Sequence, residues 1–140
     1  MRTVRDDDGT RYVLLKESAE ASLVRNPETG EQRHVPNADL EPVEGESPLA
    51  TAAVAVPDAA RQVITATHDD RALGLLVELD DRGPLSVAEL LSAYDLCESD
   101  LHGLLAEFRA AGLLTEATVH GQRGYDTTEA ASDGLAHLRG

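Results

Sequence analysis

Six side chains have the chemistry to bind a transition metal: Cys97 and the histidines at positions 34, 68, 102, 120 and 137. Structural zinc sites draw such ligands in close pairs, as Cys-x-x-Cys or as two histidines a few residues apart. Neither spacing occurs, so we expect scattered surface histidines and no metal or other cofactor. Cys97 has no second cysteine to pair with. It is interpreted either as a half-buried structural side chain or as a redox-sensing thiol.

The motifs that mark common enzyme classes are also missing. The sequence has no Walker loop, dinucleotide-binding glycine fingerprint, Gly-x-Ser-x-Gly or His-Glu-x-x-His. Carboxylates are numerous, but no isolated pair stands in an apolar context that would shift a pKa for acid–base catalysis. We therefore expect that the protein is not an enzyme.

Arginine supplies the remaining chemistry, because its guanidinium group binds phosphate. Arg123 lies in Gly121-Gln122-Arg123-Gly124, and the two flanking glycines are typical of a hairpin tip. From such a tip Arg123 could reach a phosphate or a narrow minor groove, while a solvated loop arginine is the alternative. Residues 1–40 hold six cations and eight acids, a net charge of −2, and an ordinary solvent face is the alternative there too. The N-terminal candidates for DNA contact are Arg11, Lys16, Arg25 and Arg33.

The overall charge opposes nucleic-acid binding. The chain has 26 Asp and Glu against 12 Lys and Arg, a net charge of −14. Residues 58–140 alone hold six Arg and fifteen acids, a net charge of −9, which repels DNA at ordinary ionic strength. With only one Lys, the composition resembles that of proteins from halophilic archaea. In molar salt the Debye length falls to about 3 Å, so long-range repulsion is screened.

Length and hydropathy indicate a small protein without a membrane partner. A chain of 140 residues is one domain, or one domain with an extension. One Phe, three Tyr and no Trp leave an aliphatic core. No apolar run reaches transmembrane length, and Met1-Arg2-Thr3 opens no signal peptide. We expect a cytoplasmic protein.

Residues 1–40 are predicted to form a small antiparallel β-meander. Turn chemistry at residues 7–10 and 26–30 separates short apolar runs. The predicted strands are 2–6, 11–17, 21–26 and 31–35. Such a sheet needs a further surface to cover its apolar face. Residues 41–56 are predicted to be a linker, since 41–48 is acidic with Pro and Gly and 49–56 is ambiguous.

Residues 57–140 carry helical patterns followed by a hairpin and a last helix. Thr67 is the predicted cap of a helix that ends at Gly83-Pro84. Ser86 and Glu89 have the spacing of a capping box, and Gly112 stops a third helix. The predicted elements are helices at 57–65, 69–82, 86–93, 98–111 and 128–138, and a hairpin of strands 115–120 and 125–127.

Two segments resemble the recognition segment of archaeal and bacterial winged-helix regulators. They are LCESDL at residues 96–101 and FRAAGLL at residues 108–114. GYDTT at residues 124–128 is similar to their strand-to-helix junction. Over residues 69–138 the chain is identified as a winged helix-turn-helix DNA-binding regulator of halophilic-archaeal type. The resemblance implies an α+β fold, with a winged helix-turn-helix domain at 57–140 preceded by the β-rich subdomain at 1–40.

In that family the third helix enters the major groove and the wing touches the backbone or minor groove. Transferred to this chain, the resemblance implies DNA contacts from Ser99, His102, Gly103, Arg109, His120, Gln122 and Arg123. Asp100 and Ala106 would also face the groove. The helix departs from the family in its acids, Glu98, Asp100 and Glu107, and in Gly103, where a cation is expected. We therefore expect Arg123 and the N-terminal cations to contribute more than the helix.

The predicted function is that of a DNA-binding transcriptional regulator working in high salt. Because one winged helix with few cations needs two half-sites, we expect a homodimer on double-stranded DNA. Dimer contacts are predicted from residues 49–66, the last helix or the edge of the N-terminal sheet. The alternative is a protein–protein interaction module that docks its acidic third helix onto a basic partner protein.

Overall fold

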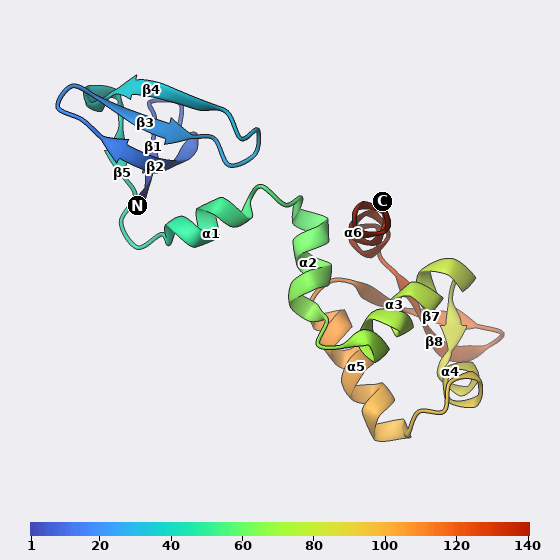
Figure 1. The fold of residues 1–140 in the computed structure, drawn as a ribbon. Helices are drawn as coiled ribbons and strands as arrows, with labels where there is room; N and C mark the ends of the chain where they lie inside the picture. The colour runs from blue at the N-terminus through green and yellow to red at the C-terminus, as the bar shows by residue number, and fades with distance from the viewer. The chain divides into compact units, whose positions relative to one another are not determined.

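The computed structural model describes every residue from Met1 to Gly140 and contains two compact units (Figure 1). We call Met1–Val56 the sheet unit and Pro57–Gly140 the winged-helix unit. The expected α+β class is confirmed: an antiparallel β-rich segment precedes a winged helix-turn-helix. None of the six helices combines the length and apolar character needed to cross a bilayer.

The sheet unit is a five-stranded antiparallel sheet in the order β4-β3-β2-β1-β5. Strand β5 follows the 3-10 turn η1 and returns to pair with β1. The apolar core is Val4, Tyr12, Leu14, Val24 and Val35, with Leu40 packed against it. The four predicted strands are all present, and the observed elements are β1 (Arg2–Arg5), β2 (Arg11–Glu17), β3 (Ala21–Arg25), β4 (Gln32–Pro36), η1 (Asn37–Asp39) and β5 (Glu41–Pro42).

Residues 41–56 differ from the predicted linker, because they carry β5 and helix α1 (Pro48–Ala53). Ser47 caps α1 by accepting the backbone N–H of Leu49, and Pro48 occupies the first turn, where its missing N–H costs nothing. Helix α1 packs on β1 and β2. The buried hydroxyl oxygens of Thr3 and Thr51 lie 2.6 Å apart. The helix thus supplies part of the cover that the small sheet needs.

The winged-helix unit builds a helical core closed by a three-stranded sheet in the order β6-β8-β7. Buried leucines from four helices form the core together with Phe108, which is 1% exposed. In Figure 1 the β7–β8 hairpin extends beyond the helices as a wing. The elements are α2 (Asp58–Ala66), α3 (Asp70–Arg82), β6 (Leu85–Ser86), α4 (Val87–Ala93), α5 (Glu98–Ala110), β7 (Leu114–Val119), β8 (Gln122–Thr127) and α6 (Glu129–Arg139).

Two of the helix caps predicted from the sequence are present in the structure, and one is different. The capping box of Ser86 and Glu89 is present, and Thr128 caps α6. Thr67 does not cap α3, because it ends α2 and donates its hydroxyl to the carbonyl oxygen of Val63. The cap is Asp69, whose carboxylate accepts the N–H of Ala72 at 2.9 Å. An Asp here also suits the positive end of the helix dipole.

The wing turn lies one to three residues earlier than predicted. It consists of His120 and Gly121, with φ of 50° and 77°, and positive φ at both central residues is the geometry of a tight type I′ hairpin. Gly124 lies inside β8, opposite Ala117 and Ser86. Gln122 and Arg123 are therefore strand residues rather than tip residues, which changes what Arg123 contacts.

Candidate nucleic-acid interface

Helix α5 has one buried face and one solvent-exposed face. Leu101, Leu105 and Phe108 are buried, which turns the opposite side outward. The three predicted contact residues Ser99, His102 and Gly103 are exposed on that side, as are Asp100 and Ala106. The structure thus leaves the face that the family uses for DNA free of intramolecular packing.

The exposed face of α5 offers little positive charge. The Nε2 atom of His102 lies 3.5 Å from Glu98 Oε1, and Asp100 adds a further carboxylate. A side chain at Gly103 would meet open space. Cys97 occupies the N-cap position without capping, and its exposed Sγ lies 3.4 Å from Ser99 Oγ. The small and acidic residues of this face provide hydrogen-bonding groups but few phosphate contacts.

Two arginines converge between the end of α5 and the wing. Arg109 Nη1 donates to Glu116 Oε1 at 3.0 Å, and Arg123 Nη2 donates to the same oxygen at 3.1 Å. Arg109 comes from α5, Glu116 from β7 and Arg123 from β8. We call these three residues the arginine clamp. The clamp brings together one predicted residue of the helix and one of the wing.

Tyr125 holds Arg123 in place within the clamp. Arg123 Nη2 donates to the Tyr125 hydroxyl at 2.8 Å, and the guanidinium carbon lies 5.7 Å from the ring centroid. These contacts with Tyr125, together with the charge of Glu116, raise the pKa of Arg123 above its usual value. Tyr125 is only 4% exposed, so it is a rigid support.

The two remaining predicted wing residues lie in the turn and directly after it, His120 in the turn and Gln122 as the first residue of β8. His120 and Gln122 are exposed, and His120 occupies the first turn position. His120 also lies close enough to Glu89 to contribute to the lowered pKa of that carboxyl, after the larger effect of the hydrogen bonds with Ser86. The end of the wing therefore presents an imidazole from the turn and an amide from the start of β8.

The sheet unit divides its cations between two faces. Strand register places Arg11 and Arg25 on one face, since Arg25 pairs with Val13, two residues from Arg11. Lys16 pairs with Leu23 on that same face. Arg33 is opposite Val24 on the other face, where it donates to the Tyr12 hydroxyl at 2.6 Å. The four predicted N-terminal residues therefore do not form one surface.

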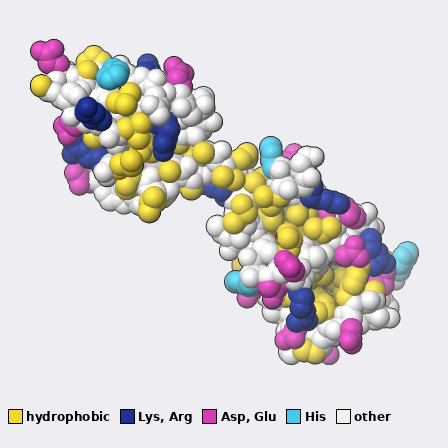
Figure 2. Space-filling view, in the orientation of Figure 1, with side chains coloured by type: hydrophobic (Ala, Val, Ile, Leu, Met, Phe, Trp, Pro, Cys, Tyr) yellow, Lys and Arg dark blue, Asp and Glu magenta, His cyan; other side chains and the backbone are white.

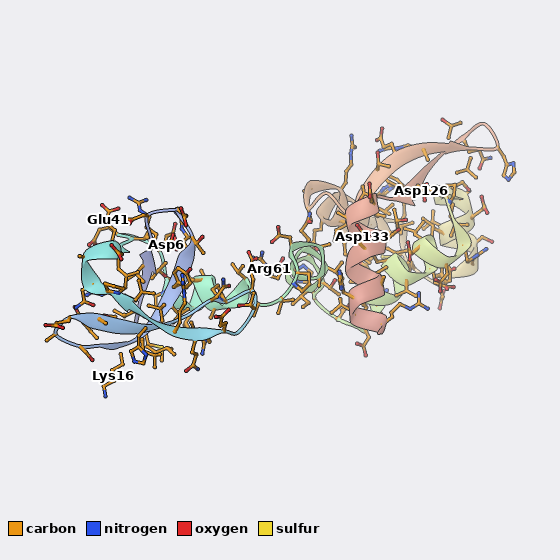
Figure 3. All side chains as sticks on the ribbon, turned by 90° about the horizontal axis from the view of Figure 1, so that it is seen from above. Asp6, Lys16, Glu41, Arg61, Asp126 and Asp133 are labelled. Atoms are coloured by element: carbon orange, nitrogen blue, oxygen red, sulfur yellow. The ribbon has the colours of Figure 1, made fainter.

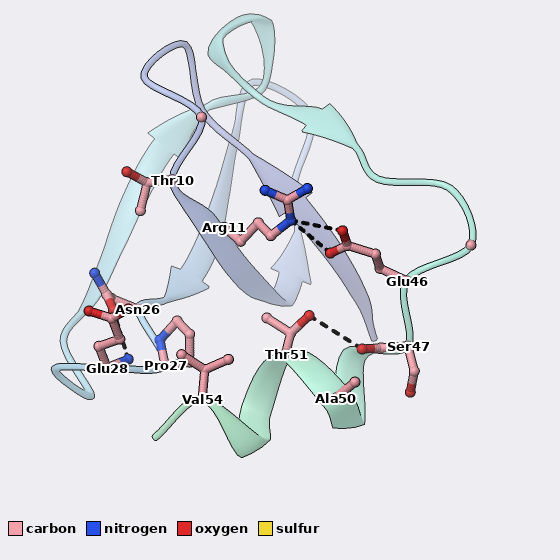
Figure 4. A pocket seen from close by; sticks show the side chains of 12 residues that line it. Thr10, Arg11, Asn26, Pro27, Glu28, Glu46, Ser47, Ala50, Thr51 and Val54 are labelled. Atoms are coloured by element: carbon pink, nitrogen blue, oxygen red, sulfur yellow. Dashed lines mark hydrogen bonds and ion pairs between the residues drawn. The ribbon is translucent and has the colours of Figure 1, made fainter. Parts of the chain in front are cut away.

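The three cations on the shared face differ in their partners. Arg11 Nε donates to both carboxylate oxygens of Glu46, at 2.9 and 2.8 Å, beside a hollow lined by α1 (Figure 4). Lys16 makes no ion pair and points outward from the sheet (Figure 3). In Figure 2 the cationic side chains on the visible face are interspersed with acidic ones rather than gathered in one patch. Lys16 and Arg25 are the less neutralised of the N-terminal cations.

Sequence reasoning missed Glu116 and Tyr125. With the turn at residues 120 and 121, Glu116 pairs with Tyr125 and Thr118 with Arg123. Glu116 and Arg123 are then diagonal neighbours on one face, a separation that long side chains span. A hairpin tip at residues 121–124 gives a different register and hides this pairing. A two-residue His-Gly turn was the available signal.

Titratable side chains elsewhere do not gather as metal ligands. No group of three or more His, Cys, Asp or Glu is placed to hold an ion. The closest histidine contacts are single carboxylate pairs, such as His68 Nε2 to Glu107 Oε2 at 2.8 Å.

Three comparisons place these features among known proteins. The model of DUF7346, a family of unknown function, matches residues 1–139. The crystal structure of the transcriptional regulator HlyU from Vibrio vulnificus CMCP6 is similar, with 25% sequence identity and a TM-score of 0.51. The similarity covers 65% of this chain and 95% of that chain, and it supports the winged-helix assignment. No curated protein matches the sequence significantly.

Proposed function

The chain belongs to DUF7346, a family of unknown function. We propose that it is a DNA-binding transcriptional regulator. The arginine clamp beside an exposed α5 carries the proposal. In a winged helix the third helix enters the major groove and the wing touches the backbone or minor groove, so the phosphate backbone lies near both elements. Two guanidinium groups directed there supply the charge that phosphate binding needs.

The similarity to HlyU, a transcriptional regulator, supports regulation as the purpose of DNA binding. The acidic face of α5 indicates that base readout depends on Ser99, His102 and Gln122, which can donate or accept hydrogen bonds. The clamp and the sheet unit's Lys16 and Arg25 would then provide backbone contacts rather than sequence readout.

We propose that the protein acts as a homodimer through the α2 and α6 surface. Ile64 and Leu138 are large apolar side chains that are 52% and 45% exposed and lie in the same groove, and contiguous exposed apolar surface is typical of interaction sites. Together with Leu73 and Val77 they line an apolar groove over α2, α3 and α6. A second copy is the proposed occupant, because two half-sites compensate for the few cations of each.

The net charge of −14 sets the conditions in which this function operates. At low ionic strength the acids repel DNA over the whole surface, whereas molar salt confines electrostatics to direct contacts. We propose that the protein works at high salt. Close contacts such as those of Arg123 then matter more than the summed charge.

Fluorescence anisotropy with labelled genomic fragments tests the function, from low salt to molar KCl. The variants are Arg109→Ala and Arg123→Ala, with Arg2→Ala as the matched control, because Arg2 pairs with Glu17 in the sheet unit, on the face opposite Lys16 and Arg25. Each clamp variant should weaken binding and reduce the salt slope by about 0.9 per lost phosphate contact. Binding by the control should equal wild type. Absence of DNA binding by wild type at every salt concentration would reject the function.

A protein-interaction module is the second candidate, favoured by the exposed carboxylates of α5. Glu98 and Asp100 leave this helix face acidic. In that case a basic partner protein would dock there. Asp100→Lys should abolish capture of such a partner while leaving folding intact. If DNA binding improves with Asp100→Lys and no partner is captured by wild type, the interaction module is excluded.

A further inference from the structure

We propose that Glu116 is an internal competitor for the DNA phosphate: it holds Arg109 and Arg123 together in the free protein and is displaced when the backbone binds. The inference rests on the proposed DNA-binding function and names the site and the ion that it takes, a phosphodiester oxygen. It also assigns to an acid of the wing a direct effect on affinity and salt dependence.

The geometry is that of an anion site with its anion already present. Both arginines donate to one oxygen, Glu116 Oε1, at 3.0 and 3.1 Å. Two guanidinium groups converging on a single oxygen are also how arginines bind a phosphate oxygen. Glu116 reaches this position because its pairing with Tyr125 places it diagonally to Arg123. The carboxylate therefore occupies the place of the ligand.

The contacts are exposed enough to exchange. The side chains of Arg109, Glu116 and Arg123 are 53%, 47% and 62% exposed. Ion pairs at such exposure are weak because water and salt compete with them. A phosphate arriving with neighbouring contacts can then replace the carboxylate without unfolding any element.

Arg123 remains directed after Glu116 leaves. The Tyr125 hydroxyl accepts Arg123 Nη2 at 2.8 Å, and the guanidinium lies over the ring of Tyr125. Because Tyr125 is buried, neither contact depends on the carboxylate. The site is thus partly preorganised, which lowers the entropy cost of binding an anion.

The charge balance of the clamp also favours a second anion. Two guanidinium groups and one carboxylate leave a net charge of +1 in a unit whose net charge is −9. Arg61 and Arg139 each pair with an acid of their own, Asp58 and Asp81. The clamp therefore differs from these arginines in sharing one acid between two cations.

The test compares Glu116→Gln with Asp126→Asn in full-length protein. Asp126 pairs with Thr115 on the opposite face of the same hairpin and touches no arginine in the structure. Both variants remove one negative charge, and asparagine can still accept the N–H that Asp126 accepts from Thr127. Anisotropy with labelled genomic fragments is measured from low salt to molar KCl, and thermal unfolding verifies the fold of each variant.

Glu116→Gln should bind roughly three- to tenfold more tightly at low salt, the range expected from releasing two exposed ion pairs. Its salt slope should be slightly steeper than that of wild type, because no displaced carboxylate then takes up cations when DNA binds. Asp126→Asn should change affinity less and leave the slope as in wild type. Arg123→Ala should cost more affinity in the Glu116→Gln background than in wild type, a coupling that only contact explains.

The failures can be distinguished. If wild type binds DNA, but Glu116→Gln and Asp126→Asn have the same affinity and salt slope, the role of Glu116 is overturned and the proposed function stands. No DNA binding by wild type or by Glu116→Gln at any salt overturns both. Glu116→Ala repeats the measurement without the glutamine amide. If Glu116→Ala and Glu116→Gln both bind more tightly than wild type, a new hydrogen bond from that amide is not the cause.

Discussion

Gly124 of β8 and Leu85 of β6 approach so closely that a Cβ atom at Gly124 would lie 2.5 Å from the Leu85 carbonyl oxygen. This contact joins the wing to the strand that opens α4, since Leu85 pairs with Tyr125 and Ser86 with Gly124. Gly124 does not have a positive φ, so glycine is required here for space. A side chain would collide with the backbone of Leu85 and a methyl group of Val119.

Gly124→Ala should destabilise the winged-helix unit by about 1–3 kcal/mol, the usual cost of overpacking. The backbone of β6 or β8 must move, because a carbonyl oxygen cannot rotate away. Urea unfolding followed by circular dichroism measures the change. Gly74→Ala is the control: a side chain in α3 there meets nothing within 4 Å, so it should stabilise by about 0.5–1 kcal/mol. Equal effects of the two substitutions would contradict the close contact.

Thr51→Val should destabilise the sheet unit by about 1–3 kcal/mol, since it leaves the buried Thr3 hydroxyl without its partner. Urea unfolding measures the loss. The double variant Thr3→Val with Thr51→Val should recover part of the loss, because neither buried hydroxyl then remains. If the loss of stability in the double variant equals the sum of the losses in Thr3→Val and Thr51→Val, the two hydroxyls do not hold α1 on the sheet.

Ser86→Ala should cost about 1 kcal/mol by removing the hydroxyl that accepts the Glu89 N–H. The Glu89 side chain forms the other half of the capping box by accepting the Ser86 backbone N–H, and its contribution should depend on pH. Hydrogen bonding with Ser86 lowers the pKa of Glu89 below its usual value of 4.5. Its stabilisation is therefore complete above about that pH and is lost as pH falls through the lower, folded-state pKa.

Thermal unfolding from neutral to acidic pH tests this titration, with Glu89→Gln as the reference. Wild type should be the more stable protein at neutral pH, and the difference should shrink in acid. A difference that grows as the pH falls would mean that the carboxylate does not stabilise the capping box.

Ile64→Asp should convert the proposed dimer to monomer, because a carboxylate in the apolar groove over α2 and α6 would be buried without a partner. Sedimentation equilibrium in molar KCl measures the change. Leu49→Asp is the control from the sheet unit, where Leu49 is 81% exposed, and should leave the mass unchanged. Loss of the dimer in Leu49→Asp alone would move the interface to α1.

Much of the fold could be predicted because local chemistry decides it. Short apolar runs bounded by turn chemistry defined strands β1 to β4 of the sheet unit, and the Ser86–Glu89 spacing located the start of α4. The outward face of α5 followed from the spacing of Leu101, Leu105 and Phe108. Helix α1 was not predicted, since an Ala-rich run of six residues has little intrinsic stability and forms by packing on the sheet.

The sequence by itself determined the five helices of the winged-helix unit, strands β1 to β4, the caps of α4 and α6, and the acidic face of the third helix. Only the tertiary structure decided which charges meet. The wing register placed Glu116 between Arg109 and Arg123, and the sheet register put Arg33 on the face opposite Arg11. The physical reason is that strand side chains alternate, so a shift of one residue moves a side chain to the other face. Helices and caps depend on neighbours along the chain, whereas ion pairs between strands depend on that register.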